Sequence, residues 1–479
     1  MNQSLIHSTE NGNLYIYDNQ RRLSMLVHPE FENAFTKSPN GDPYYLKKYA
    51  YLKNHGFFAN LNHTDFIPLE ESMVRENIVN TKQIVFEVTD SCNLKCTYCA
   101  LGDLYDAVDE RMGKKINAHY AINLLKYIFD LKPKCENTQL IIGFYGGEAL
   151  LNMSFIKQIV EIANQLNIKK KVELVYSMTT NATLIDKYID FLAANKFRLL
   201  ISLDGNEYNH SYRIFNKSKN NSFQKVIENV DLIQRDYPEY FSDHVNFNAV
   251  LHNRNSVKEI YEFIYMRYHK IPRISELNMR DIRQDKRDTL NRMFHSMWKS
   301  DTEFQKEDSD LSRLTHTNSS SYKELTDFLK YFSVNYYISN INALLHNVEK
   351  QLPTATCTPF SKKIFLTNRN KLLPCERVNY KYSLGRMHEK VEIDVSDITQ
   401  RYNYYYNHLI KFCQICYLYR FCGTCLFQED NIDNVDKESF VCNGFHDLEA
   451  FKNKLHYIYT FLEKYPNDFF NILENTVLE

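Results

Sequence analysis

Three cysteines in one short stretch are the residues best placed to do chemistry. Cys92, Cys96 and Cys99 follow residues 83–88, a run rich in β-branched and aromatic side chains that predicts a buried strand. Their thiols therefore lie on the loop at a strand's carboxyl end. Three thiolates leave a tetrahedral zinc ion or a four-iron cluster one ligand short, so such a cluster would keep an open iron for a small chelating molecule. Buried core cysteines, or a zinc turn with a distant fourth ligand, are the alternatives.

A second group of seven cysteines lies nearer the carboxyl end. Its paired Cys-x2-Cys spacings place two sulfurs on one metal. The group consists of Cys357, Cys375, Cys413, Cys416, Cys422, Cys425 and Cys442. A double zinc ribbon is the alternative to iron–sulfur clusters here. The remaining cysteine, Cys135, stands alone, and we expect no chemistry from it.

Composition limits the class of protein. The chain has 479 residues, enough for about three domains, and a net charge of −1, which does not favour a nucleic-acid partner. No run of 18 apolar residues and no signal-peptide pattern occurs. We therefore expect a cytoplasmic protein with no membrane partner, in which eleven cysteines indicate metal ligation rather than disulfides.

Residues 83–280 alternate between strand and helix patterns. The expected strands are 83–89, 139–145, 172–178, 198–203, 245–251 and 274–278, with helices such as 117–131 and 153–166 between them. This alternation predicts an α/β fold with a parallel sheet and right-handed crossovers. Six such units suit an open, partial (β/α)6 barrel, in which ligands collect at the carboxyl ends of the strands.

Short polar motifs follow these strands. Gly146 and Gly147, before Glu148, permit a close backbone approach, and their carbonyls could accept hydrogen bonds from a ligand ammonium. Thr180 and Asn181 follow the third strand, where a helix cap is the ordinary role of Asn.

The fourth strand is followed by a Ser-Leu-Asp-Gly motif. Ser202 begins this motif, and Arg213 comes nine residues after its Asp. The alternative for Arg213 is a surface salt bridge, which is the usual role of an Arg.

Together these motifs resemble the radical S-adenosylmethionine (SAM) enzymes over residues 83–445. The resemblance implies that Cys92, Cys96 and Cys99 hold a [4Fe–4S] cluster whose open iron binds the amino and carboxylate groups of SAM. It further implies a set of SAM-binding residues: Gly146, Gly147 and Glu148 at the amino group, Thr180 and Asn181 near the methionine and ribose, Ser202 at the ribose or carboxylate, Arg213 at the carboxylate, and Tyr98 and Leu251 at the adenine. The alternative for Leu251 is a core residue that does not contact SAM. Asn206 and Ser211 depart from the Pro and Asp that the peptide-modifying branch often has.

The second cysteine group resembles the SPASM domain, an extension of radical SAM enzymes that mature peptides and proteins. By that resemblance two auxiliary iron–sulfur clusters of the four-iron type are expected. Cys413, Cys416, Cys422 and Cys442 would hold the outer one, and Cys357, Cys375 and Cys425 the inner one. With three protein ligands, the inner cluster would have an open iron that can take a substrate thiolate or another donor. The alternatives are a fourth ligand from Glu, Asp or water, or a smaller cluster.

Three details of this region depart from or extend the SPASM pattern. Only two residues separate Cys422 from Cys425, where the family has three, and Asn370 replaces a Gly but can adopt left-handed geometry. Glu376 stands where sulfatase-maturating enzymes have a catalytic Asp base. A salt-bridged carboxylate is the alternative for Glu376.

Residues 1–80 are expected to form a separate module. Strands at 14–17 and 23–27 predict a hairpin, followed by helices at 28–35 and 44–56. This pattern resembles the winged-helix-like module that binds leader peptides, whereas a simple cap on the barrel is the alternative. The remaining expected divisions are the barrel at 81–280, a helical bridge at 281–352, the SPASM domain at 353–450 and a C-terminal helix at 451–479.

The resemblance implies an oxidoreductase that cleaves SAM to a 5′-deoxyadenosyl radical and takes a hydrogen from a ribosomally made precursor peptide. The expected product is a thioether or carbon–carbon cross-link. The expected partners are a precursor peptide with a leader segment and an electron donor such as flavodoxin or ferredoxin. The alternatives are oxidation of a Cys or Ser in a protein partner, as in sulfatase maturation, and a zinc-stabilised binding protein without SAM chemistry.

Overall fold

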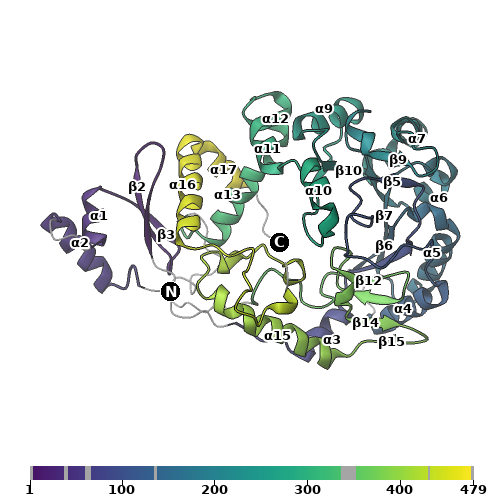
Figure 1. Ribbon diagram of the computed structural model, residues 1–479, viewed down its shortest axis with the longest axis horizontal. Coiled ribbons are helices and arrows are strands. Elements are labelled where there is room, and N and C mark those ends of the chain that lie inside the picture. Colours follow the sequence, from purple (N-terminus) through teal and green to yellow (C-terminus); the bar gives the residue numbers. More distant parts are fainter. Residues whose placement is uncertain are drawn as a thin grey trace. The chain divides into compact units, whose positions relative to one another are not determined.

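The computed structural model describes residues 4–36, 41–59, 66–133, 138–335, 352–429 and 432–475 (Figure 1). The chain divides into two compact units. The barrel unit comprises Leu69–Ser320 and Cys357–Arg401, and the flanking unit comprises Met1–Pro68, Ser321–Thr356 and Tyr402–Glu479. Each unit is therefore assembled from segments far apart in the sequence.

The barrel unit is built on a ten-stranded sheet with the order β11-β10-β8-β7-β6-β4-β12-β13-β14-β15. Its first six strands in this order are parallel, which confirms the predicted α/β barrel. They are β4 (Gln83–Thr89), β6 (Gln139–Gly146), β7 (Glu173–Thr180), β8 (Arg198–Ser202), β10 (Val245–Leu251) and β11 (Arg273–Glu276). Figure 1 shows helices along the outside of this curved sheet.

Hydrophobic periodicity explains why these helices cover the sheet. In α5 (Met153–Asn167) the buried residues include Ile156, Ile159, Val160 and Ala163, which follow the helical spacing of one apolar face. The other helices of this unit are α3 (Glu71–Val79), α4 (Ala118–Leu131), α6 (Ile189–Ala194), α7 (Phe223–Asp236), α8 (Pro238–His244), α9 (Val257–Tyr268), α10 (Arg287–Met293), α11 (Met297–Gln305) and α12 (Asp310–Thr315).

Four short strands from the cysteine-rich region extend the barrel sheet. β12 (Ile364–Leu366) pairs in parallel with β4, placing Phe365 opposite Val85. β13 (Lys371–Leu373), β14 (Gly385–Met387) and β15 (Val391–Glu392) continue the sheet as antiparallel strands. Residues 357–401 thus belong to the same compact unit as the barrel.

The flanking unit combines both ends of the chain around one core. β2 (Leu14–Asp18) and β3 (Leu23–Val27) form the predicted hairpin, and β1 (Leu5–Ser8) pairs with β2. The buried ring of Tyr17 packs in one cluster with Phe328, Phe451 and Leu455. The helices are α1 (Glu30–Phe35), α2 (Pro43–Asn54), α13 (Ser320–Tyr331), the carboxyl part of α15 (Val395–Cys413), α16 (Leu448–Lys464) and α17 (Pro466–Asn475). None of the helices described for the chain has the length and hydropathy to span a bilayer.

A buried histidine in the flanking unit makes its stability depend on pH. His7 is 1% exposed between the rings of Tyr15 and Tyr459, and neither of its nitrogens has a hydrogen-bond partner among the described residues. Burial, followed by the charges of His456 and Lys452, lowers its pKa from 6.5 to about 4.

We expect this unit to lose stability as the pH falls from 6.5 to 4. The unfolded chain then binds a proton at His7 that the folded chain does not, which costs the folded state about 3 kcal/mol at pH 4. Thermal unfolding at pH 7 and pH 5 should show a larger loss for the wild type than for His7→Phe. An equal loss in both proteins would contradict the assignment.

Candidate active site

The cysteine loop leaves β4 and pairs with a distant segment of the barrel unit. Within it, β5 (Leu94–Cys96) runs antiparallel to β9 (Arg213–Phe215), with Cys96 opposite Arg213. Burial raises the pKa of Cys92 to about 11 and that of Cys96 to about 12, and the neighbouring Cys99 thiol contributes to both shifts. The three thiols therefore lie close enough to oppose one another's ionisation, a cost that a bound cationic cluster removes.

The donor set fits a four-iron cluster with one open iron, because it offers three soft thiolates on one loop. In the part of the chain that is described, no three Cys, His, Asp or Glu side chains converge closely enough to hold a single metal ion.

The Gly-Gly-Glu loop is joined directly to the cysteine loop. Gly147 donates its N–H to the Thr89 carbonyl at 2.8 Å, and Glu148 donates to the Ser91 carbonyl at 2.9 Å. A Cβ on Gly147 would collide with the Ser91 carbonyl and lie 2.7 Å from Nη2 of Arg111. Gly146 has φ of 127°, and a Cβ there would collide with the Thr89 carbonyl. Both positions require glycine, because a side chain on either would collide with the backbone of the segment that leads into the cysteine loop.

Glu148 links the ends of β6 and β7. Its carboxylate is 1% exposed and accepts from the Thr180 hydroxyl at 2.8 Å, the Asn181 N–H at 2.8 Å and the Leu150 N–H at 3.1 Å. Burial raises its pKa, against these hydrogen bonds. The Asn181 side chain in turn donates to Oδ1 of Asn93 at 2.9 Å. The structure thus brings the second and third strand motifs together with the cysteine loop, and it commits the Glu148 side chain to this internal contact.

We expect Glu148→Gln to weaken this junction. The amide NH2 would face one of three hydrogen-bond donors, and a buried unsatisfied group costs about 1–3 kcal/mol. SAM affinity and cluster retention should both fall, measured by equilibrium binding and iron content. The matched control is Glu161→Gln, on the exposed face of α5. A variant that binds SAM as the wild type does would refute this role.

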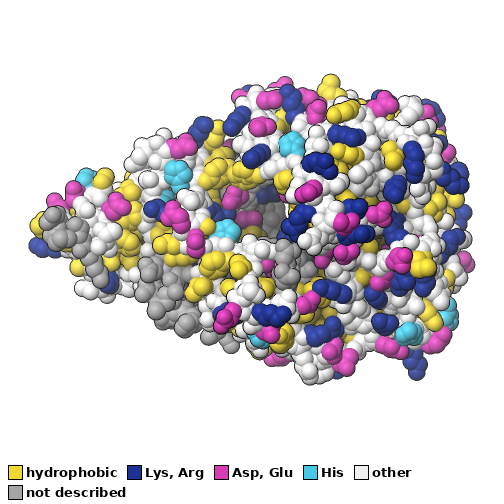
Figure 2. Space-filling view, viewed as in Figure 1, with side chains coloured by type: hydrophobic (Ala, Val, Ile, Leu, Met, Phe, Trp, Pro, Cys, Tyr) yellow, Lys and Arg dark blue, Asp and Glu magenta, His cyan; other side chains and the backbone are white. Residues whose placement is uncertain are grey.

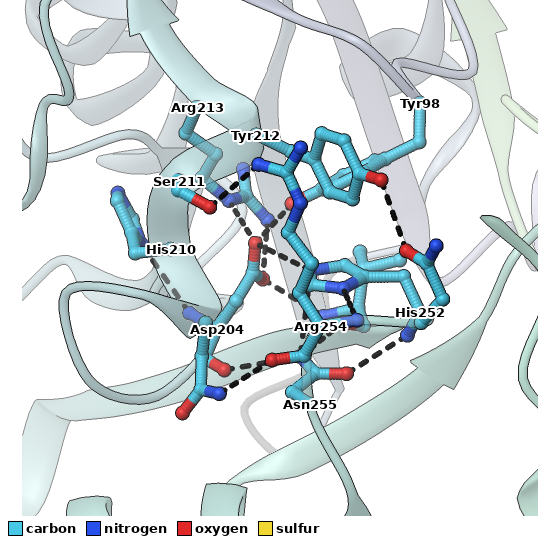
Figure 3. A network of polar contacts seen from close by, with 12 residues as sticks. Tyr98, Asp204, His210, Ser211, Tyr212, Arg213, His252, Arg254 and Asn255 are labelled. Atoms are coloured by element: carbon cyan, nitrogen blue, oxygen red, sulfur yellow. Dashed lines mark hydrogen bonds and ion pairs between the residues drawn. The ribbon is translucent and has the colours of Figure 1, made fainter.

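Arg213 and Tyr98 both bond to the buried carboxylate of Asp204. Asp204 belongs to the Ser-Leu-Asp-Gly motif, but it was assigned no role from the sequence. Arg213 donates to both oxygens of Asp204, at 2.8 and 3.0 Å, and the Tyr98 hydroxyl donates to the same group (Figure 3). The Arg213 guanidinium also lies 5.3 Å from the centre of the Tyr98 ring. Arg213 is therefore a buried ion-pair partner rather than a surface one, and two of its nitrogens are already engaged.

Arg111 is a site residue that sequence reasoning missed. Its Nε donates to the Asp90 carbonyl at 2.6 Å and its Nη1 to the Leu101 carbonyl at 3.1 Å, so it bridges both ends of the cysteine loop. Its buried Nη2 faces Gly147 and has no hydrogen-bond partner in the part of the chain that the structure describes. A single Arg in an irregular loop gives no sequence signal of this kind.

Two further predicted residues lie at strand ends of the barrel. Ser202 ends β8 and is partly buried, whereas Leu251 ends β10 with its side chain fully buried. The burial of Leu251 is that of a core residue. The contacts of both residues with SAM stay predictions.

In the flanking unit four cysteines gather around the end of α15. Burial raises the pKa of Cys413, and the charges of Cys422, Cys442 and Cys416 raise it further. Burial, with Glu429 and the same neighbours, raises that of Cys442 to about 12. The four thiols that the sequence assigns to the outer cluster are thus mutual neighbours, and their number fits one four-iron cluster.

The residues assigned to the inner cluster are divided between the units. Cys357 and Cys375 belong to the barrel unit and Cys425 to the flanking unit. Asn370 has φ of 65°, the left-handed geometry expected for it in place of Gly. Cys135 lies outside the described residues.

Glu376 lies beside Cys375 and is held by a lysine. Nζ of Lys363 donates to its two oxygens at 2.9 and 3.2 Å, and the Cys375 thiol lies 3.6 Å from Oε2. Burial would raise the pKa of Glu376, but the charge and hydrogen bond of Lys363 lower it on balance. The side chain is therefore an ionised carboxylate with 20% of its surface exposed, which meets one requirement of a base and also fits a salt bridge.

Comparison with known proteins agrees with this geometry. A model of the Radical SAM superfamily matches residues 86–264, so the chain carries a radical SAM domain. The chain is 26% identical to the cysteine-type anaerobic sulfatase-maturating enzyme of Clostridium novyi over 393 residues, which cover 78% of this chain and 96% of that enzyme. It is 24% identical to the radical SAM cyclopropyl synthase of Paramaledivibacter caminithermalis over 177 residues, 36% of this chain and 35% of that protein.

A solved structure of native anSMEcpe with bound AdoMet shares the fold. It superimposes with a TM-score of 0.54 at 20% identity, covering 82% of this chain and 99% of that one. The chain thus carries a radical SAM domain and a cysteine-rich carboxyl region, and it is similar to the sulfatase-maturating enzymes.

Proposed function

We propose that this protein is a radical SAM maturase of a ribosomally made precursor peptide, forming a thioether or carbon–carbon cross-link. The observation that carries the SAM chemistry of this proposal is the junction of the three-cysteine loop with the Gly-Gly-Glu loop through the N–H groups of Gly147 and Glu148. The neighbouring thiols of Cys413, Cys416, Cys422 and Cys442 support a second redox centre, which a cross-linking oxidation needs as an electron acceptor.

The chain's own residues would hold SAM at the open iron of the first cluster. SAM and that cluster, when bound, supply a 5′-deoxyadenosyl radical. The carbonyls of Gly146 and Gly147 would accept from the SAM ammonium, and Asn181 and Ser202 would orient the methionine and ribose. Arg213 retains one terminal nitrogen, Nη1, beyond the two that bond Asp204, which suits one contact with the SAM carboxylate.

The second half of the reaction is assigned to the carboxyl region. In a thioether product the substrate loses one hydrogen atom from carbon and a proton from its thiol, and one electron leaves as the new C–S bond forms. Cys357, Cys375 and Cys425 are the residues that would hold the inner cluster, which would supply a site for the thiolate and a place for that electron, and Glu376 would accept the proton. A flavodoxin or ferredoxin would supply the electron for the first cluster.

The amino-terminal sheet is the proposed site for the leader segment. β3 is its edge strand, since the sheet order is β1-β2-β3, and Leu26 on it is 64% exposed. The side chain of Asn335 pairs with the N–H and carbonyl of Ser24, both at 2.8 Å, so Ser24 is already covered. An added peptide strand would pair from Leu26 onward.

Oxidation of a Cys or Ser in a protein partner is the second candidate. The match to the Clostridium novyi enzyme over 96% of its length favours it. The two candidates differ in the product, because side-chain oxidation leaves no new bond between residues.

The test is incubation of the anaerobically reconstituted protein with SAM, a reductant and each short peptide encoded beside its gene. We expect 5′-deoxyadenosine together with a peptide that has lost two hydrogens and whose fragment ions are missing between the linked residues. Loss of two hydrogens within one Ser, or conversion of one Cys to an aldehyde by loss of two hydrogens followed by exchange of its sulfur for oxygen from water, would instead identify the maturase-type oxidation. Unchanged peptides, with a sulfatase peptide oxidised, would overturn the cross-linking proposal.

A further inference from the structure

The carboxylate of Asp204, just after the end of β8, is buried and accepts hydrogen bonds from several polar groups, among them two in or beside the cysteine loop. Asp204 is fully buried and accepts from Nε and Nη2 of Arg213, from the Val250 N–H at 2.9 Å and from the Tyr98 hydroxyl (Figure 3). Nε2 of His252 lies 3.8 Å from the same carboxylate. With its oxygens occupied in this way, Asp204 acts on neighbouring groups of the protein rather than on a ligand.

The cation that Asp204 neutralises lies beside a cluster ligand. Arg213 is directly opposite Cys96 in the antiparallel β5–β9 pair, so the two side chains project from the same face. The Arg213 side chain is 9% exposed, so bulk salt screens its charge only weakly.

The two histidines next to the pair add no charge of their own. Nδ1 of His210 accepts from the Asp204 N–H at 3.4 Å and its Nε2 contacts the Ser222 hydroxyl at 3.1 Å, and burial lowers its pKa to about 3. Nδ1 of His252 accepts from the Arg254 N–H at 3.1 Å, which is the arrangement of a neutral ring. The net charge of the Asp204–Arg213 pair and its histidines is therefore zero.

We propose that Asp204 keeps the reduction potential of the Cys92–Cys96–Cys99 cluster low by neutralising Arg213 beside Cys96. Reduction adds one negative charge to the cluster, so an uncompensated cation nearby stabilises the reduced form and raises the potential. A cluster that must pass an electron to a sulfonium needs a low potential. Asp204 is thus a positioning residue that acts through Arg213. This inference rests on the radical SAM domain and not on the peptide substrate.

The test is the midpoint potential of the cluster in the full-length reconstituted protein, from an EPR-monitored redox titration without SAM. The signal that later changes when SAM is added identifies this cluster. Asp204→Asn keeps the side-chain shape and should move the midpoint to a more positive value. Asp204→Asn with Arg213→Gln removes both charges and should return it toward the wild type. The matched control is Asp186→Asn, which breaks a surface pair with Lys225 (2.9 Å) and should leave the midpoint unchanged.

Each outcome decides the proposal. An Asp204→Asn protein with its cluster intact and a wild-type midpoint would overturn it. If that variant loses its iron while the double variant keeps it, the uncompensated cation is the cause and the proposal stands. If both variants lose their iron, the pair is only structural and the proposal fails.

Discussion

Replacing Gly147 with alanine should reduce SAM cleavage by about 100-fold, because displacing a binding group by about 1 Å has effects of this size. The new Cβ would collide with the Ser91 carbonyl and lie 2.7 Å from Nη2 of Arg111, and neither the backbone nor this bridged guanidinium can move without displacing the cysteine loop. Release of 5′-deoxyadenosine and SAM binding, measured on protein with full iron content, would show the effect.

The matched control is Gly143→Ala, four residues earlier on β6. There the three atoms nearest to a Cβ all belong to side chains, of Val85 at 3.2 Å and of Gln83 and Ser177 at 3.3 Å, and these can adjust. SAM cleavage in this variant should stay within a few-fold of wild type. Equal activity of the Gly147 and Gly143 variants would contradict the assigned SAM site.

Replacing Cys416 with alanine should separate SAM cleavage from product formation. Loss of one outer-cluster ligand should remove about four irons and abolish the cross-linked product, while 5′-deoxyadenosine continues to form at the first cluster. The physical reason is that an electron received at the inner site would then have no outer cluster to which it can pass. Cys135→Ala is the control and should change neither readout. Full product formation by the Cys416 variant would refute a redox role for the outer thiols.

The strands that hold the site could be predicted because each is long and apolar. The expected strand at 139–145 corresponds to β6 (Gln139–Gly146), and that at 245–251 to β10 (Val245–Leu251). The parallel order then places the polar motifs at one edge of the sheet, as expected, but the hydrogen bond between Thr180 and Glu148 was not predicted, because both residues were assigned to SAM.

The extension of the sheet by β12 could not be predicted in this way. Ile364–Leu366 is only three residues long, too short for a periodic pattern, and its partner β4 lies about 280 residues earlier in the chain. The same limit applies to the pairing of β5 with β9, which sets Cys96 opposite Arg213.

The polar contacts of the site depend on separations that a motif does not encode. The Tyr98 hydroxyl reaches Asp204 across 106 residues, and the Val250 N–H reaches it across 46. Sequence reasoning therefore found Tyr98 and Arg213 but assigned them only to the ligand. Asp204 and Arg111 became visible as site residues only once the loops were placed side by side.

The metal content of the protein tests the central claim most directly. Iron, sulfide and zinc should be measured after anaerobic reconstitution, in wild type and in Cys92→Ala/Cys96→Ala/Cys99→Ala. Three four-iron clusters predict about 12 irons, falling to about 8 in the variant, with negligible zinc. About 4 irons with two zincs would keep the SAM chemistry but reduce the cysteine-rich region to a scaffold. A wild-type protein that takes up no iron would contradict the account.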